Sequence, residues 1–146
     1  MKPSVEDLYR SEHLRLLRLG FLLSSDRQVA EDAVQEAFAS LTQRHAEIEK
    51  PAAYLRQAVV NRINDAHRRS ARRPASRDKV AVQAPELDET WDLVQGLPCA
   101  QCAVVVLRFY EDLRLVDIAA MLGRPESTVR SDLRRALQHL RSELGR

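Results

Sequence analysis

The chain has 146 residues, of which 30% are charged and 45% are hydrophobic, so it can bury one core or two small ones and remain soluble. Only four Gly are present, and the one β-branched cluster is the short run 104–106, which argues for helices over a sheet and predicts an all-helical fold. The first thirty residues lack the pattern of a signal peptide, and no apolar run could span a bilayer, so we expect a cytoplasmic protein without membrane insertion.

The net charge of +2 is distributed unevenly along the chain. Residues 62–79 contain seven Arg or Lys against two acids, and residues 124–146 contain six Arg against three acids. Between these zones, residues 86–92 carry four acids and no base. Two basic zones separated by an acidic spacer favour two contacts with one polyanion, and two solvated helix faces are the alternative explanation.

Three helices are expected in the N-terminal half. Apolar residues recur at helical spacings over 5–23, and Ser25 followed by Gln28 is typical of a capping box, which predicts a second helix from Ser25. After a polar connector at 46–50, Pro51 suits the first turn of a third helix, which runs into an Arg-rich end at 68–73. The apolar stripe of the third helix is expected to comprise Tyr54, Leu55, Ala58, Val59 and Ile63.

Residues 74–85 contain two prolines and small polar residues with little periodicity, which is typical of a flexible linker. We therefore expect two small helical domains, at 1–73 and 88–146, joined by a linker at 74–87. In the second domain, Asp88 can cap a helix over 89–95, and Leu97-Pro98 opens another helix. The residues of that helix available for burial are Val104, Val105, Leu107 and Phe109.

Residues 115–144 have the spacing of a helix-turn-helix. Ala119 is small enough for two helices to cross there, Gly123 can adopt the left-handed turn, and Val129 supplies an apolar residue early in the second helix. Ser127 or Thr128 is expected to cap that second helix. The first helix is expected to bury Val116, Ile118, Ala119 and Leu122, and the second Val129, Leu133, Ala136, Leu137, Leu140 and Leu144.

The second helix of this motif is expected to expose residues suited to DNA. Arg can bond the paired acceptors of guanine in the major groove or clamp a phosphate. Asp132 either accepts from a cytosine amino group or pairs with Arg135 and orients it. An ordinary helical hairpin with a solvated Arg face is the alternative. The exposed set comprises Thr128, Arg130, Ser131, Arg134 and Arg135.

The motif resembles region 4 of the extracytoplasmic-function group of bacterial sigma factors. Residues 115–123, followed by Ser127-Thr-Val-Arg-Ser131 and Arg135-Ala136, are similar to that family's pattern of an acidic residue before Ile-Ala, a Gly turn, Thr-Val-Lys/Arg-Ser and Arg-Ala. Residues 30–38 are similar to region 2.2, and Ala53-Tyr-Leu-Arg56 through Val60-Asn-Arg62 and Arg68-Arg69 are similar to regions 2.3 and 2.4. The two motifs stand in the family's order over nearly the whole chain.

The resemblance implies a sigma factor that directs RNA polymerase to promoters, with core RNA polymerase and promoter DNA as partners. Region 2.2 of the family docks on the β′ coiled coil, which implies core contacts by Asp32, Gln35 and Glu36. Region 4 touches the β flap through apolar residues upstream of its recognition helix. Family members are commonly held inactive by an anti-sigma factor, which joins the expected partners.

Region 2.4 of the family reads and opens the −10 element, and region 4 binds the −35 element. The extruded base is received near the loop before region 2.4, here about 45–50. The −10 set implied by the resemblance comprises Tyr54, Asn61, Arg62, Asp65, Arg68 and Arg69. The −35 set implied by it comprises Ser127, Thr128, Arg130, Ser131, Arg134 and Arg135.

Two alternative functions remain open from the sequence. Cys99 and Cys102 form a CxxC that lacks a second cysteine pair or a close His pair, so no metal site is expected, but a thiol-based redox sensor is an alternative. A stand-alone regulator that binds an operator through its helix-turn-helix is the other. The chain shows no Ser-His-Asp arrangement and no phosphate loop, so we expect no catalytic residues, no enzyme activity and no cofactor.

Overall fold

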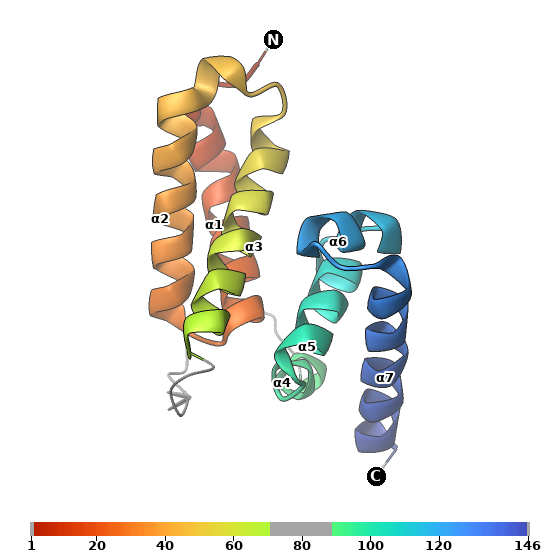
Figure 1. Ribbon diagram of the computed structural model, residues 1–146. Helices are drawn as coiled ribbons and strands as arrows, with labels where there is room; N and C mark the ends of the chain where they lie inside the picture. The colour runs from red at the N-terminus through yellow and green to blue at the C-terminus, as the bar shows by residue number, and fades with distance from the viewer. Residues whose placement is uncertain (1, 71–88, 146) are drawn as a thin grey trace. The chain divides into compact units, whose positions relative to one another are not determined.

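A computed structural model describes residues 2–70 and 89–145, and every regular element within those residues is a helix, which confirms the all-helical prediction (Figure 1). The chain divides into two compact units, Met1–Val82 and Gln83–Arg146, which are described separately. The expected linker at 74–87, the Asp88 cap and the end of the Arg-rich zone at 71–73 lie outside the described residues.

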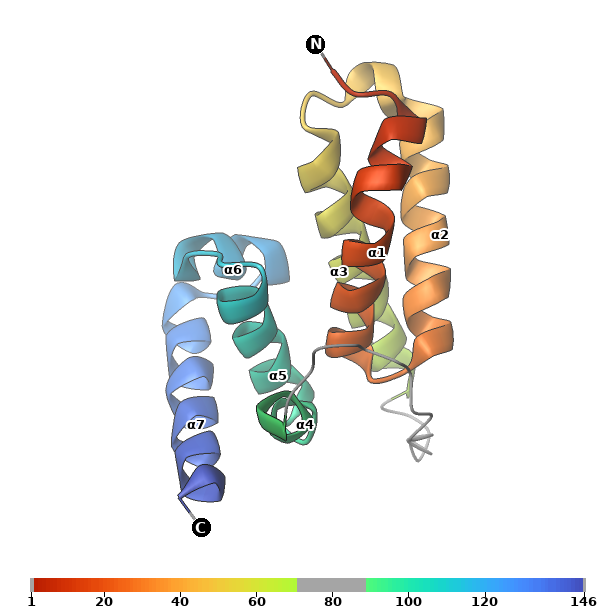
Figure 2. The same cartoon turned by 180° about the vertical axis from the view of Figure 1, so that it is seen from behind.

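The first unit is a three-helix bundle of α1 (Val5–Ser24), α2 (Arg27–Arg44) and α3 (Pro51–Ser70), with a short 3-10 helix, η1 (His45–Glu47), before α3. Seen from behind in Figure 2, α1 lies in front of and between α2 and α3. Pro51 begins α3 as expected, because a missing N–H costs nothing in the first turn of a helix.

The predicted start of α2 is wrong by one residue. Asp26, not Ser25, is the N-cap, and its carboxylate accepts from the backbone N–H groups of Gln28 at 2.9 Å and Val29 at 3.2 Å. Ser25 instead ends α1 in a left-handed conformation with φ of 56°, and its N–H donates to the Phe21 carbonyl at 2.7 Å. Ser25 and Asp26 together connect α1 to α2, and the left-handed backbone of Ser25 is not the extended conformation that an N-cap residue adopts.

The core of this unit is formed where the three helices meet. Leu19, Leu41, Leu55 and Val59 are fully buried. Gly20 allows α1 and α2 to approach closely, because a Cβ there would lie 3.1 Å from the Ala30 Cβ.

The predicted stripe of α3 is partly right. Leu55, Val59 and Ile63 are buried, whereas Tyr54 and Ala58 are only half-buried. Val60 is buried although it lies outside the stripe. The reason is that α3 packs against both α1 and α2, which buries a wider arc than contact with one helix requires.

The second unit comprises α4 (Glu89–Gln95), α5 (Cys99–Val105), the π-helical segment η2 (Val106–Tyr110), α6 (Leu115–Leu122) and α7 (Glu126–Leu144). Helices α4, α5 and α6 all pack against α7. Val104, Val105 and Leu107 are buried as expected. Phe109, however, is 53% exposed, so its predicted burial is wrong.

The widened turn of η2 explains the exposure of Phe109. The Glu111 N–H donates to the Val106 carbonyl, five residues back, at 3.3 Å. A π turn inserts an extra residue and rotates the side chains that follow it away from the preceding apolar stripe. The backbone then turns through Asp112, which has a left-handed φ of 55°.

Three further expectations for the helix-turn-helix are wrong at its edges. Val116 is 48% exposed and Leu144 is 57% exposed, so their predicted burial is wrong. Neither Ser127 nor Thr128 caps α7, which begins at Glu126 with Pro125 as N-cap and no side-chain cap. Both residues lie inside the first turn, where the Thr128 N–H donates to the Pro125 carbonyl at 3.0 Å.

Candidate nucleic-acid interface

The turn between α6 and α7 has the geometry that its sequence predicts. Gly123 adopts φ of +65°, and the Arg124 N–H donates to the Ala119 carbonyl at 3.1 Å. A Cβ on Gly123 would meet nothing within 4 Å, so the requirement for glycine comes from the backbone conformation and not from crowding. Ala119 is 7% exposed and Val129 is fully buried, which places both at the crossing of the two helices as expected.

An ion pair lies at the start of α6. Arg114 Nε donates to the Asp117 carboxylate at 2.9 Å, and this hydrogen bond together with the carboxylate's charge raises the pKa of Arg114. Asp117 is the acidic residue before Ile-Ala in the motif. In the structure it pairs with the residue just before α6, and because both side chains are exposed the pair contributes little to stability.

The outer face of α7 presents most of the residues singled out for DNA. Arg130 is paired with Glu126 at 3.0 Å. Arg134 and Arg135 have no partner among the described residues, so both guanidinium groups are available to a ligand. Ser131 is half-buried, which makes it the least accessible of the set. The exposed members are Ser127, Thr128, Arg130, Arg134 and Arg135.

Asp132 has Arg124 as its ion-pair partner and not Arg135, so the expected pairing with Arg135 is wrong. Its side chain is only 12% exposed and pairs with Arg124, with the Arg124 Nη1 to Asp132 Oδ2 distance at 3.2 Å. Asp132 follows Val129 by three residues and precedes Ala136 by four, so it lies on the buried stripe of α7. Although Arg135 is its i,i+3 neighbour on the helix, the Asp132 carboxylate is largely buried and paired with Arg124, so it does not orient Arg135 in this structure.

In the first unit, the six residues of the −10 set share one face of α3. At 100° per residue they fall within about a third of the helix circumference, opposite the buried residues. Tyr54 is half-buried and the other five are exposed. The Asn61 side-chain oxygen Oδ1 accepts from Gln57 Nε2 at 2.8 Å. Asp65 lies 3.9 Å from Arg68, and its backbone carbonyl accepts from Arg69 at 3.5 Å, so the acid partly offsets the charge of this face.

The residues expected to contact core polymerase are exposed on α2. Gln35 has no hydrogen-bonding partner among residues 2–70 and 89–145, and Asp32 accepts from Gln28 at 2.9 Å. Glu36 pairs with Arg62 of α3, with Nη1 and Oε2 3.0 Å apart. The candidate polymerase face and the candidate DNA face thus meet along a shared edge.

The loop at 45–50 is held by the N-terminal segment. Lys2 Nζ donates to the carbonyls of His45 and Ile48, the latter at 2.7 Å. In return, His45 Nε2 donates to the Pro3 carbonyl at 2.8 Å. On the α3 side of the loop, the Arg44 guanidinium lies over the Tyr54 ring at 6.0 Å from its centroid, a cation–π arrangement.

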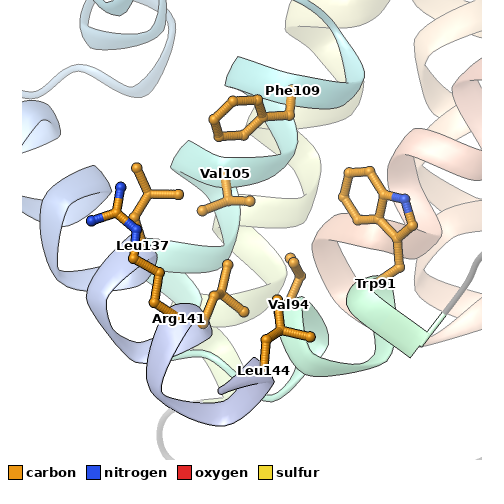
Figure 3. Close-up of a pocket in the computed structure, with 8 residues that line it drawn as sticks. Trp91, Val94, Val105, Phe109, Leu137, Arg141 and Leu144 are labelled. Carbon is orange, nitrogen blue, oxygen red and sulfur yellow. The ribbon is translucent and has the colours of Figure 1, made fainter.

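A hydrophobic groove of about 260 Å³ lies on the second unit, between α4, α5, η2 and α7 (Figure 3). Phe109 and Leu144, which were expected in the core, instead form part of its wall, and Arg141 supplies a positive charge at the same site. The Trp91 ring meets the Tyr110 ring edge-on at 6.1 Å. The remaining lining residues are Trp91, Val94, Val105, Leu137 and Leu140.

Sequence reasoning missed three basic residues that the structure places at these sites: Lys2, Arg44 and Arg124. Lys2 precedes every periodic segment, so no sequence signal connects it with a loop that lies more than forty residues away. Arg44 and Arg124 end or follow a helix, where basic residues are ordinary. In all three cases the role of the side chain depends on a contact with another element of the fold, which the local sequence does not indicate.

The cysteine pair is split by the fold. Cys99 is exposed and Cys102 is buried, and both are free thiols. Within residues 2–70 and 89–145, no group of three or more His, Cys, Asp or Glu residues could hold a metal ion. In the same residues, no helix combines the length and apolar character that crossing a membrane requires.

Comparison with known protein families gives two matches that together cover most of the chain. Residues 8–73 match the family described as Sigma-70 region 2, and residues 93–142 match Sigma-70, region 4. The first match covers most of α1 to α3, and the second contains α5 to α6 and nearly all of α7.

Full-length relatives show the same similarity. The chain is 32% identical to the RNA polymerase sigma-E factor of Streptomyces coelicolor, over 95% of this chain and 85% of the relative. It is 31% identical to the ECF RNA polymerase sigma factor SigM of Mycobacterium tuberculosis, over 96% of this chain and 76% of the relative. Among solved structures, the sigma factor RpoE in complex with the anti-sigma factor NepR from Bartonella quintana shares the fold, with a TM-score of 0.71 and 24% identity over 96% of this chain and 98% of that one.

Proposed function

Because the chain belongs to the extracytoplasmic-function group of the sigma-70 family and is an RNA polymerase sigma factor, we propose that its two units divide promoter recognition between them. Domain 1–73 binds core RNA polymerase and the −10 element, and domain 88–146 binds the −35 element, with 74–87 as the linker. The observation that carries this division is that each unit exposes a basic helix face, on α3 in one and on α7 in the other.

In the second domain, α7 enters the major groove of the −35 element. Arg134 and Arg135 are exposed and unpaired among the described residues, which leaves their donors available for guanine or phosphate. Arg130 exchanges its bond to Glu126 for DNA, because an exposed pair of this kind holds its partners weakly. Ser127 and Thr128 lie in the first turn, where the helix dipole favours a phosphate.

In the first domain, the exposed face of α3 follows the −10 element while its strands separate. Arg62, Arg68 and Arg69 neutralise phosphates, and Asn61 is placed to recognise a base edge. Tyr54 lies next to the loop at 45–50, and the Arg44 guanidinium above its ring favours stacking of an unpaired base nearby. Asp65 lowers the positive charge of this face. Non-specific attraction to phosphates is thereby weakened relative to sequence-specific contacts with the bases.

Core RNA polymerase contacts both domains. Asp32, Gln35 and Glu36 form an exposed acidic and polar face on α2 that suits a basic surface such as the β′ coiled coil. The apolar groove of the second domain suits an amphipathic element such as the β flap, with Arg141 opposite an acid of the partner. An anti-sigma factor, like the NepR protein in the complex from Bartonella quintana, would compete for these surfaces.

The protein itself performs no catalysis under this proposal, since RNA synthesis belongs to the polymerase, and it acts in the cytoplasm where the polymerase is found. Run-off transcription with core RNA polymerase and a pool of genomic DNA fragments tests the function directly. Promoter-dependent products are expected only when this chain is added. Absence of any product, with a core enzyme that responds to another sigma factor, would overturn the proposal.

A further inference from the structure

The loop between α2 and α3 has one backbone carbonyl, that of Ile48, with no backbone donor, and a second, that of His45, whose only backbone donor is at a long distance. His45 follows the last residue of α2, where the final carbonyls of a helix have no intrahelical donor, and Ile48 ends the short helix η1. Within the loop, the Ile48 N–H donates to the His45 carbonyl at 3.3 Å, and Glu47 lies 3.6 Å from Arg44. The hydrogen bond and the ion pair are both long, and the ion pair joins exposed side chains. Interactions within the loop therefore stabilise its conformation only weakly.

The N-terminal segment supplies a donor to the Ile48 carbonyl and a second donor to the His45 carbonyl. The ammonium of Lys2, which is half-buried, donates to both of these carbonyls, at the two ends of the same short turn. His45 closes the connection by donating from Nε2 to the Pro3 carbonyl at 2.8 Å. The bonds therefore run in both directions between the segment and the loop, and two of them come from a charged donor, which makes them stronger than neutral ones.

These contacts set the shape of the loop and not the packing of the bundle. Ala46, Glu47, Glu49 and Lys50 are exposed and Ile48 is only half-buried, so apolar burial contributes little to holding the loop in place. The nearest core residue of the N-terminal segment is Leu8, which is buried independently of Lys2. Removing the Lys2 ammonium would accordingly release the loop and leave the three helices packed.

We propose that Lys2 is a positioning residue that presets the loop at 45–50 for opening of the promoter DNA. The inference rests on the proposed function of domain 1–73 in opening the −10 element, with the loop receiving a base as the family resemblance implies. A loop already fixed in the receiving geometry loses less conformational entropy when the base enters, and this lowers the barrier to opening. Duplex binding through α7 does not use the loop and is unaffected.

The test compares full-length Lys2→Ala, Lys2→Arg and the wild-type chain, each assembled with core RNA polymerase on a promoter that the wild type opens. Arg10→Ala is the matched control, because Arg10 is an exposed residue of α1 whose removal deletes the same charge without changing the loop. Closed-complex affinity is measured by competition at low temperature, and the opening rate by fluorescence of 2-aminopurine in the −10 element.

Lys2→Ala is expected to slow opening by about tenfold, as loss of charge-assisted hydrogen bonds would, while closed-complex affinity and the thermal midpoint stay unchanged. Lys2→Arg restores most of the rate, because guanidinium can reach both carbonyls. His45→Ala is expected to slow opening less, since it removes only the return bond, and His45→Gln, which keeps a donor, should be faster than His45→Ala.

Opening by Lys2→Ala at the wild-type rate would overturn the inference and leave the proposed function intact. A parallel fall in thermal midpoint, closed-complex affinity and opening rate would assign Lys2 a general structural role and also overturn it. Weaker closed binding with a shallower salt dependence would mean that Lys2 contacts phosphate directly. Failure of the wild-type chain to open any promoter would instead overturn the proposed function, and this inference with it.

Discussion

Arg124 and Asp132 form an ion pair, 3.2 Å between Nη1 and Oδ2, that joins the turn of the helix-turn-helix to the second turn of its recognition helix. Asp132 lies on the buried stripe of α7, and its side chain is 12% exposed. The pair therefore fixes how the turn enters α7 and takes no part in the outer face of the helix. An acid in a DNA-binding helix is compatible with DNA binding here because it points inward and is neutralised.

Replacing Asp132 is expected to lower stability and affinity without changing sequence preference. Asp132→Ala leaves the Arg124 guanidinium near the core edge without its partner, which should cost about 1–3 kcal/mol of unfolding free energy, since Arg124 can still reach water. Urea unfolding measures the stability, and selection from randomised −35 sequences measures the preference. Arg124→Ala and the double variant complete a cycle that isolates the pair. A changed −35 preference would contradict this reading.

Arg134 and Arg135 are expected to carry much of the affinity for the −35 element. Arg134→Ala and Arg135→Ala should each weaken duplex binding by about 1–3 kcal/mol if the arginine contacts guanine. If it contacts phosphate, the slope of log K against log salt concentration should fall in magnitude by about 1. Binding is measured by fluorescence anisotropy at several salt concentrations. Arg27→Ala, which removes the same charge from α2, is the control. Equal effects of all three variants would show that only net charge matters.

The Glu36–Arg62 pair should matter for binding but hardly for folding. Its side chains are 52% and 47% exposed, and an exposed pair of this kind contributes at most about 1 kcal/mol to stability. Glu36→Lys is therefore expected to leave the thermal midpoint nearly unchanged while strongly weakening binding to core RNA polymerase. Glu31→Lys, on the same helix but outside the proposed contact set, serves as the control. Binding to core is measured by displacement of a labelled sigma factor.

Asp112 and Gly123 are expected to respond in opposite directions to substitution. Asp112 holds a left-handed φ of 55°, and its one ion pair, with Arg108 at 3.7 Å, is exposed. Asp112→Gly should raise stability by up to about 1 kcal/mol through relief of backbone strain. Gly123→Ala, at φ of +65° in open space, should lower it by about 1–2 kcal/mol. Thermal unfolding of both variants checks the signs, and destabilisation by both would refute the backbone argument.

Substitutions in the apolar groove are expected to weaken binding to core RNA polymerase without weakening binding to DNA. Phe109 and Leu144 are 53% and 57% exposed, so replacing them removes little buried area from the fold. Phe109→Ser and Leu144→Ser are expected to weaken core binding by tenfold or more, on the order of one hot-spot residue. Affinity for −35 duplex should remain within about twofold of wild type. Val116→Ser, equally exposed but outside the groove, is the control.

The helices and the helix-turn-helix could be predicted from short-range sequence patterns alone. The spacing of Ala119, Gly123 and Val129 predicted the helix-turn-helix, because a sharp crossing needs a small residue, a left-handed turn and an apolar anchor at fixed intervals. Pro51 marked the start of α3 for an equally local reason. The exposed Arg134 and Arg135 follow from the period of α7 alone.

Errors arose wherever a second element decided the outcome. Asp26 and not Ser25 caps α2, because Ser25 ends α1 in a left-handed backbone conformation. Phe109 is exposed because the π turn shifts its position relative to the apolar stripe. It lines a surface groove that the helical periodicity of the sequence did not predict. Asp132 and Lys2 found partners eight and more than forty residues away, in Arg124 and in the loop at 45–50.

By itself the sequence determined which segments are helical, which face of each helix is polar and which family the chain belongs to. These depend on intervals of a few residues, over which the chain's geometry is nearly fixed. Tertiary structure alone decided which charges are paired, which apolar side chains stay exposed and what holds the loop before α3. These depend on contacts between residues far apart in the chain, whose distances no local interval can set.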